Sequence, residues 1–250
     1  MFKVVIPARY ASARLPAKML APIGGRPLIR WVWERACASG ARRVIVATDD
    51  ERILAAAAGF GAECMMTAPG HVSGTDRVAE VARRAGFAPD EIVVNLQGDE
   101  PLVDPALLAR LAAALERDPG VDIATAAAPI GSLGEFLDPN CVKALRDAHG
   151  DALYFSRAPV PWPRDHTVGG QPARCDGAWR HIGLYAYRVE GLLRFAALAP
   201  TPLELLERLE QLRALEHGMR IHVLALDAAP PSGVDTAEDL ERVRAVLGRA

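Results

Sequence analysis

Residues 44–58 read VIVATDDERILAAAA and contain a complete strand–turn–helix unit. The run 44–47 is apolar without alternation, which is typical of a strand covered on both faces. Residues 48–51 then supply a capping side chain and acidic groups for a helix through about residue 58, because a helix N-terminus favours side-chain acceptors and negative charge. A buried strand that leads directly into a helix is the repeating unit of an α/β protein with a mostly parallel sheet.

The same alternation continues along most of the chain and predicts helices on both faces of that sheet. In such sheets ligands bind beyond the carboxyl ends of the strands, so the loops after Ile6 and Leu96 should face one cleft. The predicted strands are 3–7, 44–47, 92–96, 122–127 and 220–226, and the predicted helices are 27–39, 48–58, 78–85, 105–117, 190–197, 203–217 and 237–247.

Residues 129–187 depart from this pattern. Strand-like runs at 142–145, 152–155 and 182–187 have no long helices between them, and 147–150 reads as a hairpin turn. Residues 159–178 are rich in proline, glycine and charge, which is typical of a long functional loop. We interpret 129–187 as an antiparallel insert in one domain that covers residues 1–250.

Composition excludes several classes of protein. The chain has 250 residues, is 50% hydrophobic and 24% charged, and carries a net charge of −2, so neither a disordered chain nor a general nucleic-acid binder is expected. No window approaches the roughly 20 apolar residues that a membrane-spanning helix needs. The short apolar N-terminus is broken by Pro7, and four scattered cysteines form no CxxC pair. We therefore expect a cytoplasmic protein without a membrane partner.

The loop 7–18 places three cations, Arg9, Arg14 and Lys18, directly after a strand. A polyphosphate needs such a cluster, because charge-assisted hydrogen bonds neutralise several oxygens at once. Charge alone favours a solvated basic loop equally. The segment is not a Walker loop, since GxxxxGK[ST] is absent.

Asp99 and Asp235 each follow a predicted strand and a glycine. Magnesium usually takes one or two protein carboxylates together with substrate phosphates, so both side chains could converge on one ion. The alternatives are an acidic turn at Asp99 and a helix cap at Asp235. Thr236 could supply that cap and leave the Asp235 carboxylate for the metal.

Other polar residues remain ambiguous on pattern alone. Residues 71–77, HVSGTDR, fit either a nucleobase contact or a plain helix start. Arg157, Arg164 and His181 lie in or beside the insert and could bind an anionic substrate, or could simply be surface residues. Residues 210–211 fall on the predicted helix 203–217, where polar pairs usually face solvent.

Eight motifs resemble, in order, those of the 3-deoxy-manno-octulosonate cytidylyltransferases, also called CMP-Kdo synthetases. They cover essentially the whole chain, and the ordered set is far more specific than any single motif. The motifs are IPARYASARLPAK (6–18), VATD (46–49), SGTDR (73–77), NLQGDEP (95–101), YFSR (154–157), RHIGLY (180–185), LEQLR (209–213) and GVDT (233–236).

This resemblance implies a Rossmann-like nucleotidyltransferase fold and a homodimer formed through the insert. It also implies the reaction CTP + Kdo → CMP-Kdo + pyrophosphate, for lipopolysaccharide biosynthesis. The implied CTP-binding residues are Pro7, Ala8, Arg9, Arg14, Lys18, Ser73, Gly74 and Gln97. Of these, Arg14 and Lys18 would be catalytic together with Asp99 and Asp235, which would hold Mg²⁺. The implied sugar-binding residues are Arg77, Arg157, Arg164, His181, Tyr185, Glu210 and Gln211.

The departures from the family pattern are small. Ala17 stands where glycine is usual, and it therefore needs a backbone angle compatible with a Cβ. A cytidylyltransferase for another acidic sugar, such as a Kdo analogue or a sialic acid, remains an alternative. Sugar-1-phosphate nucleotidyltransferases fit less well, because their loop begins rich in glycine. A regulatory nucleotide-binding module would not need two metal carboxylates.

Overall fold

Three separate stretches of the chain build the first of two units in the computed structural model, which describes residues 1–11 and 15–248. Unit 1 comprises Met1–Ala113, Ala186–Ala196 and Pro230–Ala250. Unit 2 comprises Ala114–Tyr185 and Ala197–Ala229. The predicted insert 129–187 falls within unit 2 as far as Tyr185.

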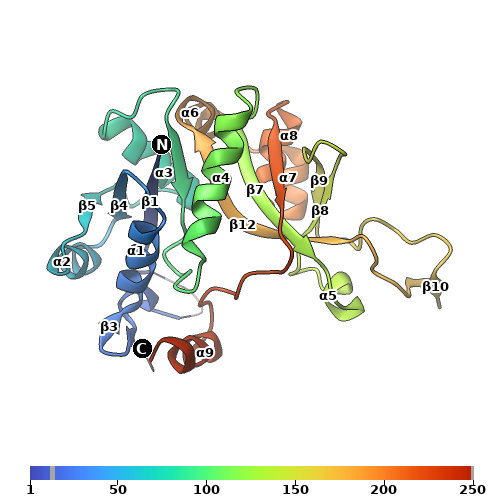
Figure 1. The fold of residues 1–250 in the computed structure, drawn as a ribbon, viewed down its shortest axis with the longest axis horizontal. Helices are drawn as coiled ribbons and strands as arrows, with labels where there is room; N and C mark the ends of the chain where they lie inside the picture. Colours follow the sequence, from blue (N-terminus) through green and yellow to red (C-terminus); the bar gives the residue numbers. More distant parts are fainter. Residues whose placement is uncertain (12–14, 249–250) are drawn as a thin grey trace. The chain divides into compact units, whose positions relative to one another are not determined.

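Unit 1 has a parallel sheet, as predicted. Strand β1 (Phe2–Ala8) lies between β4 (Arg43–Thr48) and β6 (Ile92–Asn95), and β5 (Glu63–Met66) continues the sheet beyond β4. The short strands β2 (Pro22–Ile23) and β3 (Arg26–Pro27) form a separate hairpin after the 3-10 turn Lys18–Leu20. The helices are α1 (Leu28–Ala38), α2 (Glu51–Gly59), α3 (Gly74–Arg84), α4 (Pro105–Arg117, which ends in unit 2), α6 (Val189–Ala197) and α9 (Ala237–Leu247) (Figure 1).

The core of unit 1 follows from its apolar strands. Val4, Val5 and Ile6 of β1 have no exposed surface, and neither have Ile45 and Val46 of β4. Consecutive buried residues must face both sides of the sheet, since successive side chains of a strand alternate. The unbroken apolar runs in the sequence therefore reflect helices that cover both faces.

Unit 2 is mixed. Strand β7 (Ile123–Pro129) is parallel to β13 (Ile221–Ala225), whereas β8 (Lys143–Arg146) is antiparallel to both β9 (Ala152–Ser156) and β12 (Trp179–Arg188). The turn 147–150 joins β8 to β9 as a hairpin, as predicted. The predicted loop 159–178 also contains a small hairpin of β10 (Thr167–Val168) and β11 (Gln171–Pro172). The helices are α5 (Leu133–Leu137), α7 (Pro202–Glu207) and α8 (Gln211–Glu216).

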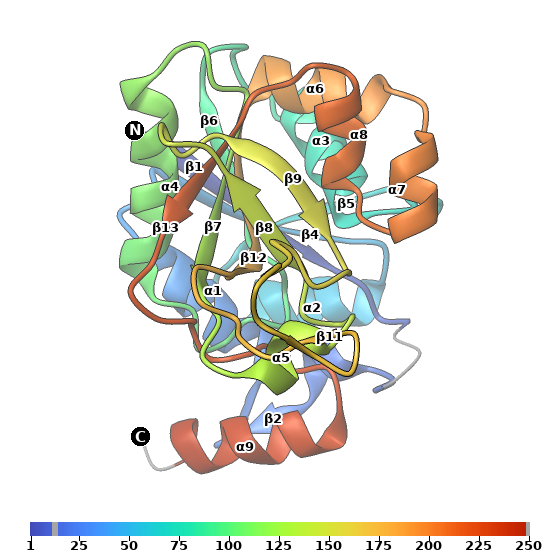
Figure 2. The same cartoon turned by 90° about the vertical axis from the view of Figure 1, so that its right-hand side faces the viewer.

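Two helix predictions were wrong. The expected helix 203–217 is two helices, α7 and α8, because Arg208 adopts the left-handed conformation (φ 54) and ends the first (Figure 2). Helix α3 begins at Gly74 instead of residue 78, because Ser73 caps it. Within the described ranges, no helix combines the length and apolar character needed to cross a lipid bilayer.

Candidate functional site

Two acidic loops of unit 1 meet at the side chain of Lys18. The ammonium Nζ donates to Asp99 Oδ2 at 2.7 Å and to Asp235 Oδ1 at 3.2 Å. Asp99 follows β6 and Asp235 precedes α9, so residues far apart in the sequence surround one cation. Burial alone would lower the pKa of Lys18, but the charges of Asp99 and Asp235 and the hydrogen bonds to them raise it above its ordinary value. Lys18 is therefore a fixed positive charge between two carboxylates.

The loop that carries Lys18 turns through a strained residue. Ala17 has φ 57 and ψ 21, the left-handed region that favours glycine. The Cβ of Ala17 is thus accommodated at some conformational cost, and the nearly buried Lys18 directly follows it.

The backbone segments that contain the two aspartates approach each other so closely that the neighbouring glycines have no room for a Cβ. Val234 N–H donates to Asp99 O at 2.8 Å. A Cβ on Gly233 would lie 2.8 Å from Asp99 O and 2.7 Å from Glu100 Oε1. On the other side, a Cβ on Gly98 would lie 2.9 Å from the sulfur of Met19. Glycine at both positions lets the loops pack against each other.

Glu100 is a third carboxyl group at this place, and the sequence motif did not single it out. Burial, together with the charges of Asp99 and Asp235, raises its pKa to about 8. Glu100 is therefore mainly protonated at neutral pH and adds little negative charge beside Lys18. Its position directly after Asp99 was the available signal.

The donor set of the pair fits magnesium. Mg²⁺ keeps several waters and takes one or two carboxylates plus substrate phosphates. Asp99 and Asp235 converge on one cation, and both are partly exposed, with 25% and 48% of their side-chain surface accessible. In the part of the chain that the structure describes, no three or more His, Cys, Asp or Glu side chains are arranged so that they could hold a metal ion by themselves. Two carboxylates open to solvent match a site completed by water and phosphate.

Three predicted nucleotide-binding residues lie together beside this pair of loops. A Cβ on Gly74 would lie 3.3 Å from both polar atoms of the Gln97 side chain and from Pro7 Cγ. The Gln97 amide also donates to Asn95 Oδ1 at 3.2 Å. Ser73 caps α3, since its hydroxyl accepts from Asp76 N–H at 3.1 Å. The helix-start interpretation therefore accounts for the Ser73 side chain.

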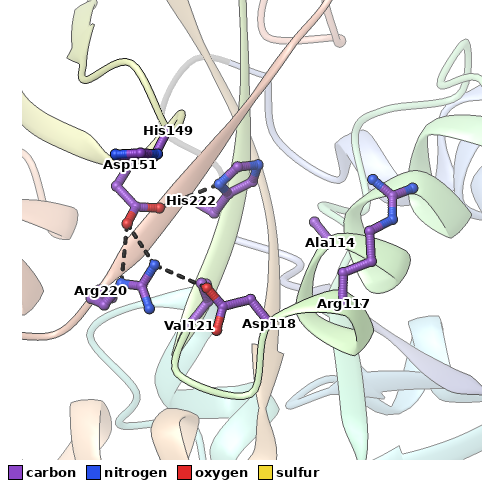
Figure 3. Close-up of a pocket in the computed structure, with 8 residues that line it drawn as sticks. All are labelled: Ala114, Arg117, Asp118, Val121, His149, Asp151, Arg220 and His222. Atoms are coloured by element: carbon purple, nitrogen blue, oxygen red, sulfur yellow. Dashed lines mark hydrogen bonds and ion pairs between the residues drawn. The ribbon is translucent and has the colours of Figure 1, made fainter.

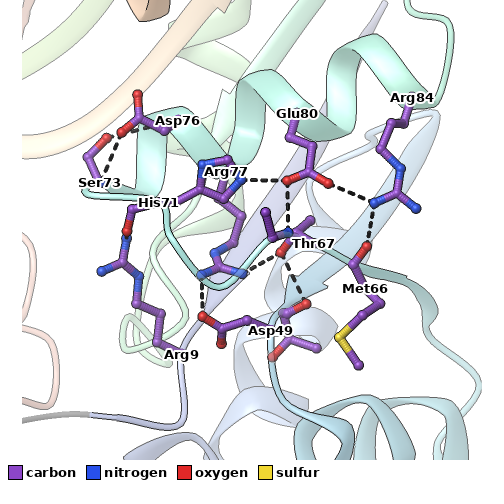
Figure 4. Close-up of polar contacts among 12 residues, drawn as sticks. Arg9, Asp49, Met66, Thr67, His71, Ser73, Asp76, Arg77, Glu80 and Arg84 are labelled. Carbon is purple, nitrogen blue, oxygen red and sulfur yellow. Dashed lines mark hydrogen bonds and ion pairs between the residues drawn. The ribbon is translucent and has the colours of Figure 1, made fainter.

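Of the other predicted residues in the basic loop, the structure describes Ala8 and Arg9. Ala8 is buried at the end of β1. Arg9 donates to His71 O at 2.6 Å, which ties the loop to the segment before α3 (Figure 4). Arg14 lies outside the described residues.

The placement of Arg77 corrects the sequence prediction. Its side chain is fully buried in unit 1, where it donates to Asp49 Oδ2 at 2.7 Å and to the hydroxyl of Thr67 (Figure 4). An arginine with no exposed surface cannot contact a sugar in this conformation. Arg77 instead ties α3 to the residues directly after β4 and β5, Asp49 and Thr67.

The remaining predicted sugar-binding residues lie in unit 2. Arg157 donates to three backbone carbonyls, of Glu207 at 2.6 Å, Pro139 at 2.8 Å and Arg208 at 3.4 Å. The guanidinium therefore holds the break between α7 and α8 against the loop after α5. Arg164 is exposed in the long loop.

His181 and Tyr185 lie near each other on β12, with ring centroids 5.5 Å apart. A hydrogen bond of 3.0 Å joins His181 Nε2 to the hydroxyl of Thr125. Burial lowers the pKa of His181 to about 3, so the imidazole is neutral near pH 7.

Glu210 and Gln211 sit at the start of α8, directly after the break that the sequence did not predict. Gln211 is only 7% exposed, and its buried Nε2 has no hydrogen-bond acceptor among the described residues. A buried amide donor without a partner is costly, which marks this position as one that an external acceptor could satisfy.

A separate pocket of about 280 Å³ in unit 2 contains none of these residues (Figure 3). Its Arg220 bridges Asp118 at 3.0 Å and Asp151 at 2.7 Å, and His222 Nδ1 lies 3.3 Å from Asp151. The charges at its centre compensate one another and tie the start of β13 to the β8–β9 turn and to the end of α4. We regard this network as structural.

Known proteins are similar to this chain over nearly its full length. The family model described as cytidylyltransferase matches residues 3–221. The 3-deoxy-manno-octulosonate cytidylyltransferases of Pseudomonas fluorescens and Thioalkalivibrio sulfidiphilus are each 54% identical to it, and each alignment covers 98% of this chain and 98% of the relative.

Solved structures agree with these relatives. The structure of a CMP:2-keto-3-deoxy-manno-octonic acid synthetase complexed with CTP is 41% identical, with a TM-score of 0.89, over 100% of this chain and 99% of that one. A cytidylyltransferase from Leptospira borgpetersenii, at 16% identity and a TM-score of 0.64, shares the fold; that match covers 100% of this chain and 87% of that one. The Rossmann-like nucleotidyltransferase fold is thus confirmed, and the chain belongs to the cytidylyltransferase family, among the 3-deoxy-manno-octulosonate cytidylyltransferases.

Proposed function

We propose that this protein transfers CMP from CTP to the anomeric hydroxyl of Kdo and releases pyrophosphate. The observation that carries the proposal is the convergence of Asp99, Asp235 and Lys18 beside the loop after β1. A nucleoside triphosphate requires such a mixture of cationic and metal-binding groups. Relatives that share about half of their residues with this chain bear the name of this activity.

The reaction needs positioning and charge compensation more than a protein nucleophile. The Kdo hydroxyl loses its proton to solvent as its oxygen bonds to the α-phosphorus, while the bond from that phosphorus to the oxygen of the β-phosphate breaks and pyrophosphate leaves. Lys18 would compensate the negative charge that develops on the leaving group, together with Arg14. Gln97, Gly74 and Pro7 would hold the nucleotide on the other side of the loop.

Magnesium would be held by the Asp99 and Asp235 carboxylates and would supply positive charge for the triphosphate. Lys18 is well placed to contact the same phosphates, since its ammonium already lies between these carboxylates. The neighbouring Glu100, when protonated, adds no further negative charge to oppose the incoming nucleotide.

The sugar side is assigned to residues of unit 2. The unsatisfied buried donor of Gln211 supports a hydroxyl or carboxylate acceptor there. His181 is neutral near pH 7 and lies beside Tyr185, so it offers a hydrogen bond without a fixed charge. Arg157 would act mainly by holding the backbone that leads to Glu210 and Gln211.

We further propose that the enzyme is a cytoplasmic homodimer that supplies lipopolysaccharide biosynthesis. CTP is an intracellular metabolite, and the resemblance to the family supports the dimer. Size-exclusion chromatography with light scattering would measure the oligomeric state, and a monomer at micromolar concentration would contradict it.

Pyrophosphate release with CTP and a panel of sugar acids tests the proposed reaction. Kdo should be the preferred acceptor, and preference for a sialic acid would redirect the assignment to another acidic sugar. Asp99→Asn should lower turnover at least about a hundredfold without unfolding the protein. Asp227→Asn is the matched control, because the exposed Asp227 lies outside the site. Near-normal activity of the Asp99 variant would refute the metal assignment.

A further inference from the structure

Side chains from the first two turns of α9 form hydrogen bonds with the backbone of the loop that carries Asp235. Arg242 Nη2 donates to Ser232 O at 3.0 Å and to Gly233 O at 3.2 Å. The same nitrogen donates to Asp239 Oδ1 at 2.9 Å. One cationic side chain thus binds both backbone carbonyls on the N-terminal side of Val234.

Asp239 holds the other side of the same loop. Its Oδ2 accepts from the backbone N–H of Asp235 at 3.1 Å and of Thr236 at 3.0 Å. Thr236 in turn accepts from Asp239 N–H at 3.2 Å, which completes a capping box. The cap therefore falls to Thr236, as the sequence suggested, and the Asp235 carboxylate points to Lys18 instead.

The clamped loop is also fixed to the Asp99 loop. Val234 is fully buried, and its N–H donates to Asp99 O. Gly233 touches Asp99 and Glu100 so closely that no Cβ would fit. Residues 232–234 thus connect the contacts from α9 to both the Asp99 loop and Asp235.

We propose that Arg242, with Asp239, is a positioning residue that sets the spacing of the Asp99 and Asp235 carboxylates and thereby their affinity for a divalent cation. The inference rests on the proposed metal role of this pair. Groups that orient metal ligands typically contribute tenfold or more to metal affinity. Arg242 touches neither carboxylate of the pair in the described contacts, so it acts through the backbone.

The chain offers both a rescue variant and a matched control. All three contacts of Arg242 come from one nitrogen, and a lysine ammonium carries three donors on one nitrogen, so Arg242→Lys should restore the clamp in part. Arg244 lies on the same helix but donates to Pro22 O at 3.0 Å and to Glu241. Arg244→Met therefore removes an equivalent side chain without releasing the Asp235 loop.

The test is direct titration of Mn²⁺ in the presence of CTP, followed by electron paramagnetic resonance of the free ion. Arg242→Met should weaken Mn²⁺ binding by about tenfold, Arg242→Lys by less, and Arg244→Met by less than twofold. The Mg²⁺ concentration for half-maximal pyrophosphate release should shift in the same order, whereas kcat at saturating Mg²⁺ should change little.

Two outcomes would overturn the inference. Unchanged Mn²⁺ affinity in Arg242→Met would show that the clamp does not position the ligands, and an equal loss in Arg244→Met would show a general effect of α9. Asp99→Asn separates these from failure of the proposed function. If Asp99→Asn abolishes Mn²⁺ binding and Arg242→Met does not affect it, only the positioning role fails. If Asp99→Asn binds Mn²⁺ normally, the metal assignment itself is wrong.

Discussion

Removal of Asp49 should destabilise the protein because it leaves the buried guanidinium of Arg77 without a compensating carboxylate. Arg77 has no exposed surface; it donates to the Asp49 carboxylate, which compensates its charge, and to the neutral Thr67 hydroxyl (Figure 4). Its Nε is already buried without an acceptor among the described residues. Asp49→Ala would leave the guanidinium with one neutral acceptor. Breaking a buried pair in this way costs about 3–5 kcal/mol, which corresponds to a fall in Tm of roughly 6–20 °C for a chain of this length.

The double variant sharpens this prediction. Arg77→Met fills a similar volume without charge, so Asp49→Ala combined with Arg77→Met should be more stable than Asp49→Ala alone. Urea unfolding followed by circular dichroism would measure the free energy of unfolding for Asp49→Ala, for Arg77→Met and for the double variant. The reasoning is refuted if Asp49→Ala costs less than about 1 kcal/mol, or if the second substitution recovers no stability.

The single variant Arg77→Met also tests whether Arg77 has a structural role rather than a role in sugar binding. Because the side chain reaches no surface, folded Arg77→Met should keep the KM for the sugar acid within about threefold. A tenfold rise in KM with an unchanged Tm would restore the original prediction that Arg77 binds sugar.

Three further predictions concern single positions. Ala17→Gly should raise stability by about 1 kcal/mol, seen as a Tm increase of about 2–4 °C, because glycine relieves the left-handed conformation of residue 17; an unchanged or lower Tm would contradict this. Gly74→Ala should raise the KM for CTP more than it lowers kcat, since the added Cβ would press on Gln97 at 3.3 Å; an unchanged KM would argue against a nucleotide role for that contact. The depressed pKa of His181 means that the folded state binds fewer protons than the unfolded state between about pH 6.5 and 3. Stability should therefore fall as the pH drops through that window, by at most about 1.4 kcal/mol per pH unit, and His181→Gln should reduce this slope in urea titrations at pH 7 and pH 5. An identical slope in both proteins would show that His181 is not protonated on unfolding.

Much of the fold could be predicted because local signals agreed with the tertiary structure. Helix α4 begins at Pro105 and ends at Arg117 as predicted, and α9 also has its predicted bounds. The helix 203–217 failed for a physical reason. Its apolar spacing continues across Arg208, and neither glycine nor proline marks the residue that turns into the left-handed region. An arginine in that conformation leaves no pattern in the sequence.

The candidate site was predictable where topology alone brings residues together. Asp99 follows the end of strand β6, and Asp235 lies just before helix α9. Because ligands bind at the carboxyl ends of the strands in an α/β sheet, the convergence of these two residues could be inferred from the sequence pattern. The burial of Arg77 could not, because its partner Asp49 lies 28 residues upstream. The clamp by Arg242 was missed although a signal existed, since Thr236 and Asp239 have the spacing of a capping box.

The division of the chain between the two units has a consequence for biosynthesis. Unit 1 contains Asp99 within its first stretch, but Asp235 belongs to the stretch Pro230–Ala250, which the ribosome makes only after the last residues of unit 2. Strands β1, β4 and β6 can pair early during translation, since domains begin to fold from the N-terminal side. The nascent chain nevertheless lacks the second carboxylate, and the Val234 contact to Asp99, until almost everything else has been synthesised. If Asp235 holds the metal as proposed, an incomplete translation product that ends before residue 234 would lack this carboxylate and would be inactive even where its earlier strands have paired.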